Sequence, residues 1–394
     1  MFGSYSKEKQ SRLEKPMLFA AIGLMLIGVA FIFSASTASD PRSQLWLKQV
    51  IFYLLGAGLA VAFCVLDYHS WSRWSLVAYW GMILLLVAVL IFGTRRGGAK
   101  RWIDLGFFQF QPSEFAKLAF IFMQASFLSR PLEELRLFQI FVKAIVLTTI
   151  PFLLILKEPD LGSALVFFPI SLTMMYVAGV DSKYLRRFLF GVGVLISLIV
   201  ADVLFAPKNW QIKLENYQRQ RLLVYFGKDF AGDQASPTER KRLREVQRQK
   251  SYQIEQALIS VGSGGFAGKG WRQGTQNALG FLPRGAAHND FIFSVIAEEK
   301  GFLGSVTVLV LYTVVLFGGI KIAGQARDRL GKLLAVGIVT LLFSHVFINI
   351  GMNIRLMPVT GIPLPLLSYG GSSVLCSLIA IGILQNIYIY RRTY

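Results

Sequence analysis

The chain has 394 residues, 54% of them hydrophobic, and its mean hydropathy is positive. A soluble domain of this length does not need so many nearly continuous apolar runs, so the composition excludes an ordinary soluble protein. The formal net charge of +19 does not indicate a nucleic-acid-binding protein, because the sequence lacks a basic platform with interleaved aromatic residues.

Ten apolar runs of roughly 20 residues are each long enough to cross a bilayer. We therefore expect an all-α polytopic membrane protein, with about ten transmembrane helices in a single membrane domain over residues 1–394. The runs lie near residues 17–37, 46–66, 74–93, 113–130, 137–156, 161–180, 184–205, 291–321, 331–354 and 366–389.

Lys and Arg in the short connections predict how these spans are oriented. They are concentrated in the N-terminal tail and in the even-numbered connections, which carry Arg73, Arg130 and Lys183 among others. We therefore expect both termini in the cytoplasm. The first run lacks a small-residue cleavage site, which favours a retained helix over a signal peptide.

The connection after the third span breaks this charge pattern, because it places Arg95, Arg96, Lys100 and Arg101 outside. The fourth span then carries Glu114 and, three residues later, Lys117. Ionisable groups inside spans are costly and usually face a cavity or each other. These two side chains can share one helix face and pair. The alternative is that Glu114 only supports the first turn of its helix.

Residues 206–290, between the seventh and eighth spans, form the longest connection and the predicted large extracytoplasmic loop. From residue 208 to residue 290 it holds 14 Lys and Arg against 7 Asp and Glu. Its middle predicts a basic helix, which either lies along anionic headgroups or is simply solvated. Its last part mixes glycine with large apolar residues, so we expect it to pack on the outer surface. Those glycines do not match the context of a nucleotide-binding loop.

Acidic residues are also concentrated at the start of the eighth span. Asp290 lies at its outer boundary, and Glu298 and Glu299 follow about 12 Å deeper, at about 1.5 Å per residue. Acidic residues beneath a rim of cations predict a polar cavity that opens outward. Such a cavity suits a substrate with an anionic headgroup and a lipid tail. The alternatives are that Asp290 only caps its helix, and that the two glutamates bridge to Lys117 or Lys300.

Five segments resemble the SEDS proteins, which comprise RodA, FtsW and SpoVE, and the likeness extends over nearly every span. The "IDLG", "EPDLG" and "GTQ" segments are more similar to RodA than to FtsW. The five are RWIDLGFFQFQPSEFAK, EPDLGSALVF, SVGSGGFAGKGW, HNDFIFSVIAEEKGFLG and PVTGIPLPLLSYGGSS.

The resemblance implies an enzyme of the inner membrane that polymerises lipid II into β-1,4 glycan strands for cell elongation and rod shape. It implies a class B penicillin-binding protein as partner, together with elongation proteins of the MreC and MreD type. By the same resemblance, Asp290 is the essential carboxylate. The substrate-binding positions that we expect are Arg101, Trp102, Glu114, Lys117 and His288.

Polymerisation turns an α-linked sugar diphosphate into a β link, so one displacement with inversion needs one general base and stabilisation of the leaving group. We expect Asp290 to be that base, at an active site that faces outward. Arg101, with Lys100 or Arg355, is expected to meet the leaving undecaprenyl diphosphate. A divalent cation, Mg²⁺ or Mn²⁺, is the alternative, and the residues indicate no other cofactor.

Two other functions remain open at this point. A lipid II flippase also needs a deep polar cavity, although no inverted repeat links the two halves of the chain. A scaffold that only recruits other cell-wall enzymes would not need the embedded acids.

Overall fold

The computed structural model describes residues 13–96, 99–104, 106, 109–205, 216–227, 237–282 and 285–391. The basic ends at 1–12 and 392–394, and parts of the large loop 206–290, lie outside these residues. The elements are α2 (Lys15–Ser39), α3 (Leu45–Val65), α4 (Tyr68–Arg73), α5 (Ser75–Phe92), β1 (Thr94–Arg96), β2 (Ala99–Asp104), β3 (Gln109–Phe110), α6 (Pro112–Leu128), α7 (Leu132–Leu135), α8 (Phe138–Lys157), α9 (Leu161–Leu165), α10 (Phe167–Ala178), α11 (Ser182–Phe205), α12 (Asn216–Tyr225), α13 (Pro237–Ser263), α14 (Thr275–Ala278), α15 (Ile292–Gln325), α16 (Arg329–Asn353) and α17 (Gly371–Tyr390).

The helices confirm an all-α polytopic membrane protein. Within the described residues, nine spans are long and apolar enough to cross a membrane, with α9 and α10 together forming one of them. The remaining predicted span, 113–130, is α6, whose 17 residues are at the lower limit for a transmembrane helix. Every predicted span therefore corresponds to a helix or to a pair of consecutive helices.

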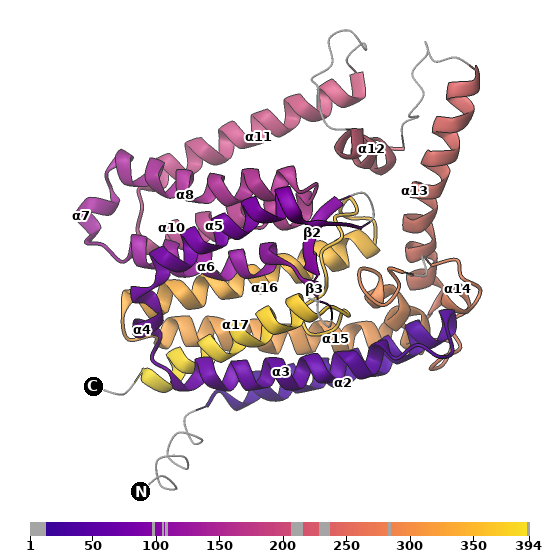
Figure 1. Cartoon of the computed structure of the whole chain (residues 1–394), viewed down its shortest axis with the longest axis horizontal. Coiled ribbons are helices and arrows are strands. Elements are labelled where there is room, and N and C mark those ends of the chain that lie inside the picture. Colours follow the sequence, from indigo (N-terminus) through magenta and orange to yellow (C-terminus); the bar gives the residue numbers. More distant parts are fainter. Residues whose placement is uncertain are drawn as a thin grey trace, which may run out of the picture.

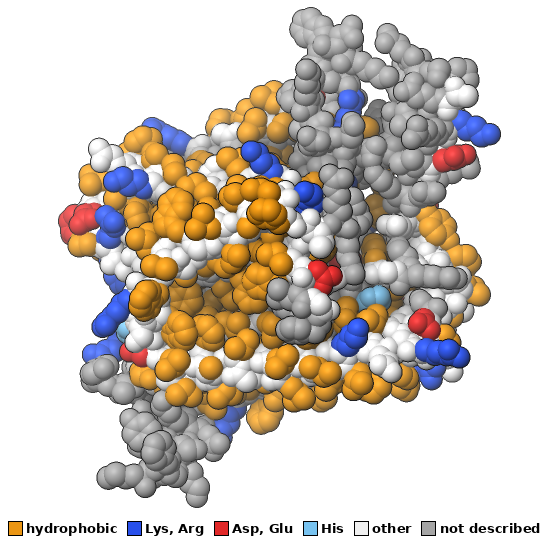
Figure 2. All heavy atoms as spheres, viewed as in Figure 1, with side chains coloured by type: hydrophobic (Ala, Val, Ile, Leu, Met, Phe, Trp, Pro, Cys, Tyr) orange, Lys and Arg blue, Asp and Glu red, His pale blue; other side chains and the backbone are white. Residues whose placement is uncertain are grey.

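The long helices run side by side in one bundle, in which α17 lies between α16 and α3 (Figure 1). Of the α17 span 94% is buried, against only 6% of the α11 span. Neighbours of α17 include α3, while α15 packs on both α2 and α16. Hydrophobic side chains cover the flank of the bundle, as expected of a surface that faces lipid (Figure 2).

A small antiparallel sheet, β1-β2-β3, lies at one end of the bundle, which we call the sheet end (Figure 1). It forms from the basic connection after the third predicted span, and Ile103 pairs with Phe110 across β2 and β3. The first and last described helices begin and end at the opposite end, where the Glu14 backbone N–H donates to Gln385 Oε1 over 2.9 Å.

The helix α15 is not the straight span that the sequence predicts. Its backbone leaves the helical region at Gly301, where φ is 63° and ψ is −154°. A side chain there is strained, and a Cβ atom would lie 2.4 Å from the backbone nitrogen of Gly268. The short helix from Ile292 to Lys300 therefore runs in a different direction from the long helix that follows it and crosses the bundle.

Candidate active site

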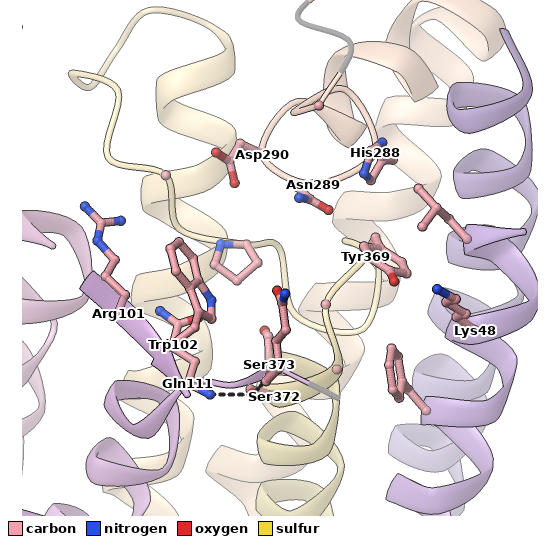
Figure 3. A pocket seen from close by; sticks show the side chains of 18 of the residues that line it. Lys48, Arg101, Trp102, Gln111, His288, Asn289, Asp290, Tyr369, Ser372 and Ser373 are labelled. Carbon is pink, nitrogen blue, oxygen red and sulfur yellow. Dashed lines mark hydrogen bonds between the residues drawn. The ribbon is translucent and has the colours of Figure 1, made fainter. Parts of the chain in front are cut away.

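A cavity of about 690 Å³ opens at the sheet end of the bundle, between β2, α3 and the turn before α15 (Figure 3). Four of the six predicted site residues line it: Arg101, Trp102, His288 and Asp290. The other lining residues are Leu45, Lys48, Phe52, Asp104, Gly106, Gln109, Gln111, Ser163, Gly285, Asn289, Gly361, Pro363, Tyr369, Gly370, Gly371, Ser372 and Ser373.

Asp290 is half-buried and lies on the turn that precedes α15. The backbone N–H groups of Asn289 and Phe291 both donate to the carbonyl of Ala286, which closes this turn. Figure 3 shows the carboxylate on the side of the cavity where Arg101 and Trp102 lie. The structure therefore places this acid in the cavity, rather than leaving it only as a cap on its helix.

The electrostatic surroundings of Asp290 favour the protonated acid more than water does. Burial, and after it the charge of Asp160, raises the pKa of the Asp290 carboxyl to about 6. The cations Arg101 and Arg221 act in the opposite direction. A carboxylate whose pKa is close to neutral is suited to take up and release protons at physiological pH.

Arg101 is largely engaged by the protein itself. Its Nε donates to the carbonyl of Glu158 over 3.1 Å, and Nη2 donates to the carbonyl of Pro159. The remaining Nη1 lies 3.9 Å from Asp160 Oδ2. The guanidinium therefore ties β2 to the turn that begins α9, and Asp160 caps that helix by accepting from the Ser163 N–H over 3.1 Å.

Glu158 lies behind this turn and is fully buried. Neither of its carboxylate oxygens has a hydrogen-bond partner among the described residues. Burial raises the pKa of Glu158 to about 9, with Asp160 adding to the shift and Arg101 opposing it. Glu158 is therefore neutral at physiological pH. The carboxylates that interact with the positive charge of Arg101 are then Asp160 and Asp290.

Glu114 and Lys117 do not line the cavity but form a buried ion pair inside the bundle. Lys117 Nζ lies 2.7 Å from Glu114 Oε1 and 2.9 Å from Nε2 of His345. All three side chains are at most 4% exposed. Sequence reasoning missed His345, although an ionisable residue in the middle of the predicted span 331–354 was itself a signal.

Lys48 is a second residue that sequence reasoning missed. It extends from the first turn of α3 and faces the cavity from the wall opposite Asp290 (Figure 3). The side chain of Lys48 makes no hydrogen bond or ion pair with the residues that the structure describes, whereas that of Arg101 does. Its position at the start of an apolar run could have indicated a functional cation.

Lys100 and Arg355, predicted as alternative partners of a diphosphate, are not among the residues that line the cavity. Lys100 Nζ donates to the carbonyl of Ile91 over 3.1 Å, and Arg355 is exposed beyond the end of α16. The side chains of Arg95 and Arg96 lie outside the described part of the chain.

His288 lines the cavity beside Tyr369, and the two rings meet edge to face at 5.5 Å. Burial lowers the pKa of His288, so the imidazole is neutral at physiological pH. Its Nδ1 has no partner among the described residues. The backbone N–H of Tyr369 donates to the His288 carbonyl over 2.9 Å, which joins the turn before α15 to the turn before α17.

Glu298 and Glu299 hold the glycine-rich part of the large loop, and neither pairs with Lys117. Lys269 Nζ lies 2.7 Å from Glu298 Oε1, and the Arg272 backbone N–H donates to Glu299 Oε2 over 3.0 Å. Their sequence-based position, deeper in the bundle than Asp290, assumed a straight α15. Because the helix changes direction at Gly301, the two carboxylates instead meet the loop.

Comparison with known proteins shows the same architecture over nearly the whole chain. Peptidoglycan glycosyltransferase MrdB of Escherichia coli K12 is 34% identical over 380 residues, which cover 96% of this chain and 94% of that protein. Stage V sporulation protein E of Bacillus subtilis is 36% identical over 383 residues, which cover 95% of each.

Two solved structures agree with these relatives. One chain of a peptidoglycan synthase complex that coordinates polymerization and crosslinking matches with a TM-score of 0.78 and 26% identity, over 97% of this chain and 99% of that one. The crystal structure of the rod-shape-determining protein RodA of Thermus thermophilus matches with a TM-score of 0.66 and 26% identity, over 96% and 98%. The model of the cell cycle protein family of FtsW, RodA and SpoVE matches residues 14–393, so the chain belongs to this family.

Proposed function

We propose that the protein is a peptidoglycan glycosyltransferase, which polymerises lipid II into β-1,4 glycan strands during cell elongation. The observation that carries this proposal is the position of Asp290, a carboxylate in a cavity at one end of a membrane bundle. Burial raises its pKa to about 6, which suits a general base. The relatives MrdB and RodA, both named peptidoglycan glycosyltransferases, support the same activity.

In the proposed reaction, Asp290 accepts the proton of the 4-hydroxyl group on the acceptor sugar. The freed oxygen forms a bond to the anomeric carbon of the donor, while the bond from that carbon to the diphosphate breaks. Undecaprenyl diphosphate leaves with the electron pair, and the anomeric centre inverts from α to β. A single displacement of this kind needs no covalent enzyme intermediate, so one base is sufficient.

Lys48 is the residue that we assign to the leaving diphosphate, in addition to the predicted Arg101. Its ammonium faces the cavity and has no partner among the described residues, so it is available to bind phosphate oxygens. We expect Lys48→Gln to lower kcat/KM about 10- to 100-fold, the effect of losing one charge-assisted hydrogen bond. The matched variant Lys183→Gln changes an exposed lysine at the other end of the bundle. Equal activity of the two variants would contradict this assignment.

A divalent cation bound to the diphosphate is the second part of this proposal. Mg²⁺ usually keeps several of its waters and binds largely through substrate phosphates rather than in a dedicated protein site, so the diphosphate itself would bring such an ion to the cavity. Such an ion would add positive charge at the diphosphate, because the guanidinium of Arg101 is already engaged by backbone carbonyls. We therefore expect chelation with EDTA to slow polymerisation and added Mg²⁺ or Mn²⁺ to restore it, as measured by glycan product.

The likeness to a peptidoglycan synthase complex supports a crosslinking partner for this chain. We propose that the partner is a class B penicillin-binding protein, and that proteins of the MreC and MreD type join the same machinery. The charge distribution supports cytoplasmic termini, in which case the sheet end and the cavity face the outside.

The experiment that tests the function is polymerisation of lipid II by the purified chain in proteoliposomes, with and without the partner. Glycan strands that depend on Asp290 are the expected product. Transfer of lipid II across the bilayer without polymer would indicate a flippase instead. Polymer made only by the added partner, and unaffected by Asp290→Asn, would indicate a scaffold.

A further inference from the structure

Three polar side chains follow one another at four-residue spacing on α16: His345, Asn349 and Asn353. Residues four apart share a face of a helix, so the three form a polar stripe. They are 4%, 0% and 0% exposed. Burying such groups in an apolar bundle is costly unless they are hydrogen bonded. His345 contacts Lys117, but the two asparagines contact a different part of the protein.

Asn349 uses both amide hydrogens on backbone carbonyls. Its Nδ2 donates to the carbonyl of Asp290 over 3.0 Å and to the carbonyl of Ile362 over 2.8 Å. Ile362 follows Gly361, where a Cβ atom would lie only 3.6 Å from Asp290 Oδ2. Asn349 therefore holds the two backbone segments that flank the carboxylate of Asp290.

Asn353 donates to the same carbonyl of Asp290, over 3.1 Å. Its second donor contact is to the carbonyl of Asn349 at 2.8 Å, and its Oδ1 accepts from Ser294 Oγ at 2.6 Å. Ser294 lies in the first turn of α15, four residues after Asp290. One asparagine thus joins the Asp290 peptide to the helix that begins directly after it.

We propose that Asn349 and Asn353 are positioning residues for Asp290, fixing its peptide plane so that the carboxylate stays directed into the cavity. The inference rests on the proposed role of Asp290 as the general base. A carbonyl oxygen held by two buried side-chain donors fixes the direction of the bond to the neighbouring side chain. A base must be held within hydrogen-bond reach of the proton that it removes, and a shift of about 1 Å can cost about 100-fold in rate.

The test is the pH dependence of polymerisation by the Asn349→Ala and Asn353→Ala variants. We expect kcat to fall about 100-fold in Asn353→Ala, by loss of alignment. We also expect the acid limb of the kcat profile to move to lower pH, because a released carboxylate turns toward water and loses part of its desolvation. If the two asparagines had only a structural role, the variants would contain a smaller fraction of active protein. That would lower kcat without moving the acid limb.

The shift of that limb depends on the charged groups around Asp290. Asp160, Arg101 and Arg221 act on its pKa, Lys48 and Asp104 line the same cavity, and neutral His288 lies on the same turn. None of them is changed in the asparagine variants. A limb that moves therefore reports a new position of the Asp290 carboxylate, and a limb at the wild-type pH overturns the proposal.

Asn386 provides a matched control at the other end of the bundle. It too is 0% exposed, and its Nδ2 donates to the carbonyls of Cys64 and Leu66 over 2.8 Å and 2.7 Å. We expect Asn386→Ala to lower the melting temperature as much as Asn353→Ala does, but to leave the pH profile in place. A profile that shifts equally in both variants would overturn the proposal.

Two further variants keep the outcomes separable. If Asn353→Ala does not fold, Ser294→Ala removes only the bond to Asn353 Oδ1, and it must shift the limb in the same direction or the proposal fails. Asn353→Ala added to Asp290→Asn is expected to slow the residual rate no further. Wild-type polymerisation by Asp290→Asn would refute the base assignment itself, whereas an inactive Asp290→Asn beside a normal Asn353→Ala would refute only the positioning role.

Discussion

Asp290→Asn is expected to lower polymerisation by about 10²- to 10⁴-fold, the usual contribution of a general base. The amide cannot accept the proton of the sugar hydroxyl, while its shape is nearly that of the acid. Because the carboxylate is held where burial opposes its charge, the same change should leave the fold intact or raise its melting temperature. The measurement is the rate of glycan synthesis, with thermal unfolding followed on the same sample.

Two comparisons make this result specific to the position of the base. Asp104 also lines the cavity, so Asp104→Asn removes an equal charge from the same space, and we expect less than about a tenfold loss. In the wild-type protein, kcat should fall as the pH drops through about 6, because Asp290 then gains a proton and can no longer accept one. An active Asp290→Asn protein, or an acid limb that survives in it, would contradict the mechanism.

Lys117→Ala should produce the largest loss of stability, on the order of 3–5 kcal/mol. The substitution removes the cation that lies 2.7 Å from Glu114 and leaves a buried carboxylate without its charge partner. Both side chains are at most 3% exposed, so water cannot replace the lost contact. The free energy of unfolding in detergent, measured with a denaturant series, gives the magnitude.

Removing both charges separates the cost of an unpaired charge from the value of the pair. In the double variant Glu114→Gln with Lys117→Met, no charge is stranded, and we expect most of the stability to return. A Lys117→Ala protein as stable as the wild type would show that the buried pair does not exist. A double variant as unstable as Lys117→Ala would show that packing, and not charge, accounts for the loss.

Apolar length was enough to predict where the helices lie, because a bilayer imposes a local requirement of about 20 apolar residues. The cap that Asp160 provides to α9 also depends only on the residues next to it in the sequence. The placement of Asp290 and Arg101 at one cavity was also anticipated, through the resemblance of their segments to the SEDS proteins.

The partners of the buried polar groups could not be predicted in this way. Lys117 and His345 are 228 residues apart, and Glu299 and Ser34 are 265 apart, so each pair exists only once particular helix faces have packed. The position of Glu298 and Glu299 depends on the change of direction at Gly301. The spacing of apolar residues along the sequence does not indicate that change.

The amino-acid sequence by itself thus determined the number and place of the helices, the family, and which carboxylate to examine. Only the tertiary structure decided that Arg101 is engaged by backbone carbonyls, that Lys48 faces the same cavity, and that two asparagines of α16 hold the Asp290 peptide. The physical reason is that hydrophobic burial is set by composition along each segment, whereas hydrogen bonds between segments need donors and acceptors to meet within about 3 Å.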